Sequence, residues 1–178
     1  MKKVAAFLTI ACSLLLLHAC IMGNGVTGDS GKLIDRQRCR FKLPGDLVLK
    51  PIDTSEFDKE GYFEITSHDE NETLQIFVFD HKTDVDEQLN MQQKALDTPA
   101  VFTAKTITPI KQWGKYNSKG ILMNGLYAGG VIKGKITVFA YSTDKRGFLV
   151  IQQDVGSHES EKADIKLVAD SFFLKQAP

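Results

Sequence analysis

Apolar and polar residues alternate along much of the chain after residue 37, which is the pattern of half-buried β-strands. The alternation and the β-forming residues predict strands at 39–43, 47–49, 61–66, 73–79, 105–113, 119–128, 134–142 and 147–153. Pro109 interrupts the fifth segment, which favours a place at a sheet edge. The polar stretch 68–72 and Asp144-Lys145 are typical turns, so neighbouring strands are expected to form antiparallel hairpins.

Two segments change from the strand period to the helical period. Asp84 and Glu87 have the spacing of a helix-starting capping box, and this helix should end before Pro99. Its predicted buried face consists of Val85, Leu89, Gln92 and Leu96, with Ala95 beside it. A second helix is predicted from Glu159 to Phe172, with Ile165, Val168, Ala169 and Phe172 on one face. The fold class is therefore α+β: a single antiparallel sheet of about six strands flanked by helices.

The N-terminal segment has the pattern of an export signal. Lys2 and Lys3 precede a mostly apolar run at 4–17. A membrane-spanning helix needs about 20 apolar residues, whereas the apolar region of a secretory signal needs only about 7–15. The length therefore favours a signal peptide at residues 1–19 over a membrane anchor.

Leu17-His18-Ala19-Cys20 resembles a bacterial lipobox. The resemblance implies cleavage before Cys20 and a diacylglyceryl group on its sulfur, and several acyl chains hold a protein stably on a membrane. His18 departs from the small or aliphatic residue usual there. Cleavage without a lipid and an uncleaved anchor are the alternatives. Ile21, rather than Asp, after the cysteine implies the periplasmic face of the outer membrane over the inner membrane, if the host is Gram-negative.

The stretch that follows Cys20 is rich in glycine and small polar residues. Residues 21–36 hold four glycines, a composition typical of a flexible linker. Gly23-x-Gly25-x-x-Gly28 matches a dinucleotide-binding fingerprint in letters only, because no strand precedes it and no amphipathic helix follows. We therefore predict a tether at residues 20–36 and a single domain at residues 37–178.

Charge is unevenly distributed along the chain. Residues 51–100 carry 13 acidic and 3 basic side chains, whereas residues 101–150 carry 1 acidic and 8 basic. This asymmetry could create a dipolar surface that steers a partner. The favoured interpretation is that strands of the two blocks interleave and their charges cancel. The basic residues are spaced singly, which argues against nucleic-acid binding.

Few residues suggest chemistry. Cys39 lies between two arginines in a predicted strand and is interpreted as an inward-facing structural residue. His68 and His81 lie near opposite ends of one predicted strand, too far apart to share a metal ion. The sequence predicts no metal, no cofactor and no catalytic residues. Trp113 and Tyr116 flank Gly114 and could line a groove for a partner or ligand, since such residues anchor interfaces. Ordinary packing of the same two side chains is the favoured interpretation.

Several features together resemble the PsbP-like superfamily, which includes bacterial DcrB-type lipoproteins. They are Phe41-x-Leu43-Pro44, the mid-chain helix, the glycine-punctuated hairpins and the closing segment Val168-Ala169-Asp170-Ser171-Phe172. The resemblance covers about residues 37–175. It implies an α/β/α sandwich and an accessory, scaffold or chaperone-like binding role, and it implies no catalytic residues.

The expected function is that of a membrane-anchored bacterial envelope lipoprotein that binds a protein or an envelope component without catalysis. A carrier of small apolar ligands or lipids is one alternative, and it requires an apolar cavity between sheet and helices. A hydrolase is the other, and it requires a cleft where His68 or His81 meets a serine or a carboxylate.

Overall fold

The computed structural model describes residues 31–53, 57–127, 130–156 and 159–177, with the backbone alone for residues 159–163. The strands are β1 (Lys32–Asp35), β2 (Cys39–Leu43), β3 (Leu47–Leu49), β4 (Tyr62–Ser67), β5 (Glu72–Phe79), β6 (Phe102–Trp113), β7 (Tyr116–Tyr127), β8 (Ile132–Ser142), β9 (Gly147–Asp154) and β10 (Phe173–Leu174). The helices are α2 (Val85–Leu96) and α3 (Glu159–Ser171).

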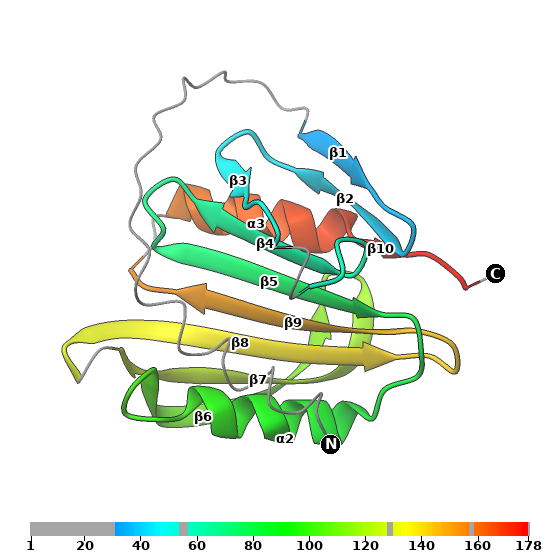
Figure 1. Ribbon diagram of the computed structural model, residues 1–178. Coiled ribbons are helices and arrows are strands. Elements are labelled where there is room, and N and C mark those ends of the chain that lie inside the picture. The colour runs from blue at the N-terminus through cyan, green and yellow to red at the C-terminus, as the bar shows by residue number, and fades with distance from the viewer. Residues whose placement is uncertain (1–30, 54–56, 128–129, 157–158, 178) are drawn as a thin grey trace.

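Seven strands form one antiparallel sheet in the order β3-β4-β5-β9-β8-β7-β6. β9 pairs with β5 on one side and with β8 on the other. The strand that carries Pro109 is β6, at one edge of the sheet, as its proline predicts. Figure 1 shows α2 at the bottom of the view, and α3 with the small sheet at the top. The α+β class is confirmed, with seven strands in the main sheet where about six were expected.

A second sheet of three strands, in the order β1-β2-β10, packs beside α3. Its first strand corrects the predicted tether, because Lys32–Asp35 pairs with Arg40–Leu43 along its whole length. Ile34 is buried in this strand while Leu33 is exposed, which is the alternation of a half-buried strand. The tether prediction included these residues because a short strand has little signal after a glycine-rich segment. The rest of the predicted tether and the signal peptide lie outside the described residues.

Both predicted helices are present. The Asp84 carboxylate accepts hydrogen bonds from the backbone N–H groups of Asp86 (2.9 Å) and Glu87 (3.1 Å), which caps α2. Leu89, Gln92 and Leu96 of α2 are buried, as the helical period predicts. The four residues predicted for the second helix face, namely Ile165, Val168, Ala169 and Phe172, are buried as well. No helix formed by the described residues is long and apolar enough to cross a membrane.

The two faces of the main sheet bury separate apolar cores. One core contains Phe63, Phe148 and Phe172, between the sheet, α3 and the small sheet. The other contains Leu89, Met123 and other side chains that lie between the sheet and α2. The core residues that the structure describes all follow Gly31, so residues 31–177 contain both cores.

The strand order separates the two charge blocks. The acidic block 51–100 includes β4 and β5, and the basic block 101–150 includes the contiguous strands β6, β7 and β8. The expectation that strands of the two blocks interleave is therefore wrong. Local cancellation occurs where α2, from the acidic block, packs on β7 and β8. There Lys119 of β7 forms an ion pair of 2.7 Å with Asp86.

Candidate functional site

The structure places Trp113 and Tyr116 in an aromatic cluster between the sheet and α3. The Trp113 ring lies 5.4 Å from the Phe172 ring and 5.6 Å from the Phe148 ring, between centroids. Tyr116 packs against Phe148 at 4.9 Å and against Tyr141 at the same distance. Because Trp113 is only 6% exposed, it offers little surface to a partner.

The turn between these two residues fits against the end of α3. Gly114 has a φ of +52°, and a Cβ there would come within 2.1 Å of the Ala169 carbonyl oxygen, so only glycine suits the position. The Tyr116 hydroxyl accepts a hydrogen bond of 2.7 Å from the Leu174 backbone N–H. Burial raises the pKa of the Tyr116 phenol. The pair thus holds the chain end against the sheet, and its role in a groove stays a prediction.

Cys39 is fully buried in β2, facing inward as predicted. Burial raises the pKa of its thiol to about 12, and the arginines beside it in sequence do not prevent this. A thiol with this pKa is protonated at neutral pH and is a poor nucleophile. Cys39 is therefore a packing residue. Cys20 lies outside the described residues.

His68 and His81 lie at the two ends of β5, as the hairpin prediction requires. His68 is in the turn before the strand and is exposed, while His81 follows the strand. The His81 Nδ1 lies 2.9 Å from an Asp80 oxygen, but the two side chains are 68% and 63% exposed. The pair therefore lies largely in open solvent. Among the described residues, no group of three or more His, Cys, Asp or Glu is arranged to hold a metal ion.

A lysine-lined hollow lies on the sheet near the β7–β8 turn, with a volume of about 450 Å³. It is lined by Lys105, Asn124, Gly125, Leu126, Lys133, Gly134, Lys135, Asp154 and Gly156. These residues come from β6, β7, β8 and the end of β9. Most of its exposed lining is apolar, although four of the nine lining residues are charged. No helix residue lines it, so it is not the cavity between sheet and helices that a lipid carrier would need.

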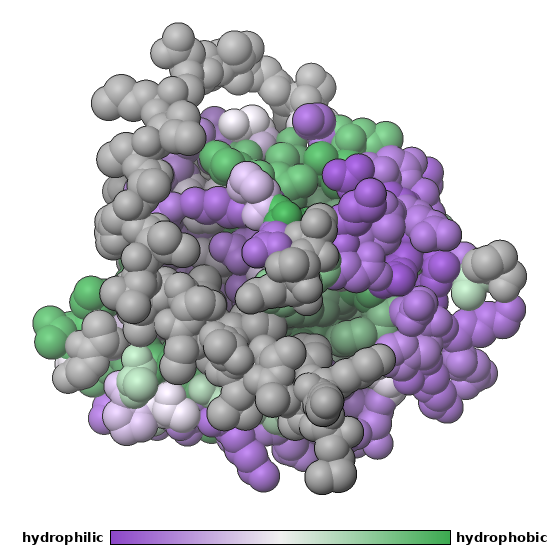
Figure 2. Space-filling model, viewed as in Figure 1, coloured by the Kyte–Doolittle hydropathy of each residue, from purple (hydrophilic) through white to green (hydrophobic). Residues whose placement is uncertain are grey.

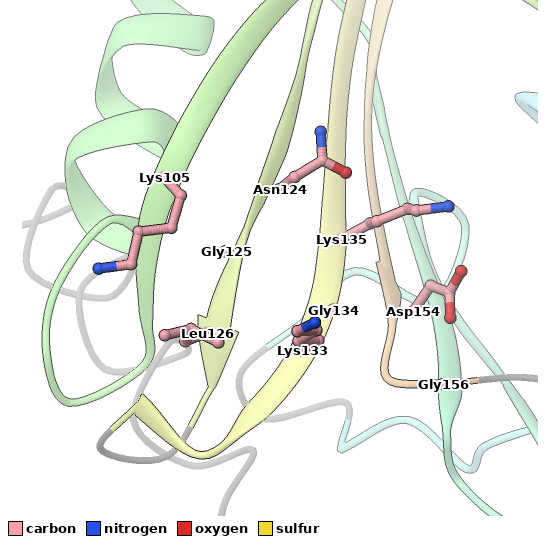
Figure 3. Close-up of a pocket in the computed structure, with 9 residues that line it drawn as sticks. All are labelled: Lys105, Asn124, Gly125, Leu126, Lys133, Gly134, Lys135, Asp154 and Gly156. Atoms are coloured by element: carbon pink, nitrogen blue, oxygen red, sulfur yellow. The ribbon is translucent and has the colours of Figure 1, made fainter.

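Strand register explains how these residues meet. Lys135 stands between Asn124 of β7 and Asp154 of β9, its direct neighbours in the sheet. Lys133 lies two residues earlier on the same strand, and residues two apart on a strand share a face. Lys105 occupies a β-bulge in β6, where the register shifts by one residue. Figure 3 shows Asn124, Lys135 and Asp154 directed to one side of the strands, and Lys105 to the other.

The backbone of the hollow depends on two facing glycines. Gly125 and Gly134 are paired across β7 and β8. A Cβ on Gly134 would come within 2.3 Å of the Tyr127 ring, and one on Gly125 within 2.7 Å of the Phe102 ring. The glycines therefore let these aromatic rings lie flat across the strands. The rings close the α2 side of the sheet, and the lysines extend from the same strands.

The electrostatics of the hollow are basic. Lys50, Lys82, Lys119, Lys166 and Lys175 each form an ion pair with a carboxylate. Within the described part of the chain, Lys105, Lys133 and Lys135 form none. Lys133 and Lys135 thus place two ammonium groups on one face of the strands, beside the carboxylate of Asp154, and Lys105 adds a third on the other side (Figure 3). Such a lining attracts anions.

Sequence reasoning did not find this hollow. Its lysines are dispersed over more than 30 positions, from Lys105 to Lys135, and only the sheet order brings them together. The local signal available was Lys133-x-Lys135 in a predicted strand. That spacing places two like charges on one face, next to the glycines of the preceding turn.

No protein-family model matches the sequence, and no curated protein is similar to it in sequence. Solved structures are similar in fold. A protein from Bacteroides thetaiotaomicron shares 12% identity at a TM-score of 0.54, over 83% of this chain and 50% of its own. This chain therefore spans about half the length of that protein. At this identity, the match shows a common fold.

Two further structures match with lower TM-scores. LpqN from Mycobacterium tuberculosis, described as involved in cell envelope biogenesis, shares 12% identity at a TM-score of 0.48, over 86% of this chain and 90% of its own. The PsbP protein of the cyanobacterium Synechocystis, CyanoP, shares 10% identity at 0.49, over 89% and 99%. This chain has an antiparallel sheet between helices, which is the architecture that the PsbP-like resemblance implies.

Proposed function

We propose that this protein is exported, anchored to the bacterial cell envelope by a lipid on Cys20, and acts there as a non-catalytic binding protein. Its partner is an envelope component or a protein with a negatively charged surface. The lysine-lined hollow carries the binding half of this proposal. It gathers three lysines that form no ion pair with any described residue at one end of the sheet, where an anionic partner has access to them.

The N-terminal sequence supports the anchoring half. The short apolar run followed by Leu17-His18-Ala19-Cys20 fits signal cleavage and acylation better than a spanning helix. Eleven residues then lead from Cys20 to Gly31, where the described domain begins. At about 3.3–3.6 Å per residue, a linker of this length reaches at most about 40 Å. A domain held this way stays close to the membrane.

Intact-mass analysis of the membrane fraction tests the anchor. We expect the wild-type protein to begin at Cys20 and to carry the mass of a diacylglyceryl group with or without an additional acyl chain. The Cys20→Ala variant should lack this mass and leave the membrane fraction. A wild-type protein without lipid and free in solution would overturn the anchoring.

Site-specific crosslinking in intact cells tests the binding surface. A photo-crosslinking residue placed at Lys135 should give a discrete adduct that the same residue placed at Lys145 does not give. Lys145 is a matched position because it is also an exposed lysine, in the turn at the opposite end of β8. Identical adduct patterns from the two positions would contradict the assignment of the hollow as the binding site.

A further inference from the structure

The β7–β8 hairpin ends in exposed apolar residues next to the lysine-lined hollow. Val131 is 82% exposed and Ile132 is 47% exposed. Figure 2 shows an apolar projection at the left margin of the molecule, where Figure 1 places the end of this hairpin. Single exposed apolar residues are common on protein surfaces. Two in succession at the tip of a long hairpin form a protruding apolar end, which we call the hairpin tip.

Lysines flank the hairpin tip on both sides of the strands. Lys133 follows Ile132 directly, and Lys135 follows two residues later along β8. Figure 3 shows Lys105 directed to the opposite side of the strands from Lys135. The end of the hairpin is apolar, and the lysines lie farther from that end on both faces of the strands. A bilayer surface has the same order, with apolar acyl chains inside and charged phosphates outside. Apolar side chains enter the interfacial region of such a surface, and basic side chains contact its phosphates.

We propose that the hairpin tip and the lysine-lined hollow together form a docking surface for a membrane rich in anionic phospholipids. Val131 and Ile132 enter the interface, and Lys133 and Lys135 bind headgroup phosphates. Asn124, the neighbour of Lys135 on β7, has a side-chain amide that can donate to the same oxygens. The inference deepens the proposed function, because it names the envelope component as the lipid surface to which Cys20 would tether the chain.

The observations favour a lipid surface over the other occupants. A small soluble anion would use the lysines and leave the hairpin tip without a function. A stable protein interface buries about 800 Å² on each partner, and a projecting hairpin end with two apolar residues offers little flat area for that. A bilayer accepts a narrow projection, because its headgroups rearrange around the inserted side chains.

Because the proposed linker at residues 21–31 keeps the domain near the membrane, a weak interaction with the lipid surface is enough to orient it. A domain that is held within about 40 Å of the bilayer by eleven residues meets the lipid surface at a high effective concentration. A few apolar side chains and two or three lysines can then orient the domain, although they would not hold a free protein tightly. Docking would fix which face of the sheet points away from the membrane.

Co-sedimentation with vesicles tests the docking surface. The test uses residues 21–178, which keep every described element and lack the acylated cysteine, and circular dichroism confirms that each variant is folded. We expect tighter binding to vesicles of phosphatidylcholine mixed with phosphatidylglycerol than to phosphatidylcholine alone, and weaker binding at high salt. At about fivefold per lysine, Lys133→Ala/Lys135→Ala should weaken binding roughly 25-fold.

Two matched controls make the test specific. Lys111→Ala/Lys145→Ala removes the same charge from exposed positions at the far ends of β6 and β8, and its affinity should stay within about threefold of the wild type. Val131→Ser/Ile132→Ser should weaken binding at both salt concentrations, whereas Leu33→Ser, at an exposed apolar residue of the small sheet, should not.

Three results would overturn the docking surface: no preference for phosphatidylglycerol, equal losses in the two lysine variants, or binding of free glycerol phosphate at the hollow without binding of vesicles. None of these results bears on the lipid at Cys20, which the intact-mass experiment measures separately. A protein that carries the lipid and fails the vesicle test would be anchored without docking. A protein that passes the vesicle test without the lipid would bind membranes through the hairpin alone.

Discussion

The ring of Tyr127 lies across the backbone of Gly134 on the neighbouring strand, so that an added Cβ would come within 2.3 Å of Tyr127 Cε2. The Tyr127 hydroxyl also donates a hydrogen bond of 3.1 Å to the Lys135 carbonyl oxygen. Gly134 separates Lys133 from Lys135. The aromatic contact therefore orders the strand that carries Lys133 and Lys135, two of the three lysines that line the hollow.

Gly134→Ala should destabilise the protein by about 1–3 kcal/mol, because the new methyl group has no room beneath the Tyr127 ring. Urea unfolding followed by circular dichroism measures the change. In a Tyr127→Ala background the same substitution should cost less by at least about 0.5 kcal/mol, since contacting residues are energetically coupled. Additive effects of the two substitutions would show that the ring contact does not hold the strand.

Trp113→Ala should destabilise the protein by about 3–5 kcal/mol, because it leaves a cavity beside Phe148 and Phe172. The unfolding midpoint in urea measures this loss. The result also tests the predicted partner groove. A groove residue could be truncated with little effect on stability and a large effect on partner binding, which is the opposite of what core packing predicts.

Arg146→Met should release the end of the chain. Arg146 is buried, and its Nη1 donates hydrogen bonds to the carbonyl oxygens of Lys175 (2.8 Å) and Gln176 (3.1 Å). Hydrogen bonds from charged donors contribute about 1.5–3 kcal/mol. We expect faster amide hydrogen exchange at Leu174 and Lys175 in the variant. Unchanged exchange there, with the protein folded, would mean that pairing with β2 and the Tyr116 hydroxyl hold the segment without Arg146.

Alkaline pH should weaken the fold through Cys39. Its pKa is raised by burial from 9.0 to about 12, so the folded state keeps a proton that the unfolded state loses first. The stabilisation is therefore fully present below pH 9 and is lost as the pH rises towards 12. Burial raises the pKa values of the Tyr62 and Tyr127 phenols in the same direction.

Urea midpoints measured from neutral to alkaline pH check this prediction, with Cys39→Ala as the comparison. The tyrosines are present in both proteins, so the difference between the two pH profiles isolates the thiol. The decline should be shallower in Cys39→Ala. A thiol reagent at pH 8 should react with Cys39 only after denaturant is added, and rapid reaction in the folded protein would contradict the burial.

Local patterns predicted most of the individual elements. The β4–β5 hairpin, the capped start of α2 at Asp84 and the buried face of α3 all follow from periods and turn residues close together in sequence. The strand order does not. β9 pairs with β5 from Glu72 to Phe79, far earlier in the chain, and no local signal specifies that a late strand enters the middle of the sheet.

The site was harder to predict than the fold, because its residues are ordinary in sequence. Trp113 and Tyr116 attracted attention as large aromatic residues beside a glycine, yet both pack against Phe148 and Phe172 in the core. Lys105 and Lys135 looked like isolated surface lysines. Their common location follows from β6, β7 and β8 being adjacent, and adjacency of strands is a tertiary property.

The central position of β9 affects when the main sheet can form during synthesis of the chain. Before Gly147–Asp154 has been synthesised, β5 and β8 each lack the partner strand on one side. The acidic strands β4 and β5 are then not joined to the basic strands β6, β7 and β8. Pairings this distant in sequence form slowly, because a long loop must close first. The main sheet therefore cannot be completed until most of the chain has been synthesised. An incomplete sheet leaves the chain open to threading through a narrow channel, which the export proposed above would require.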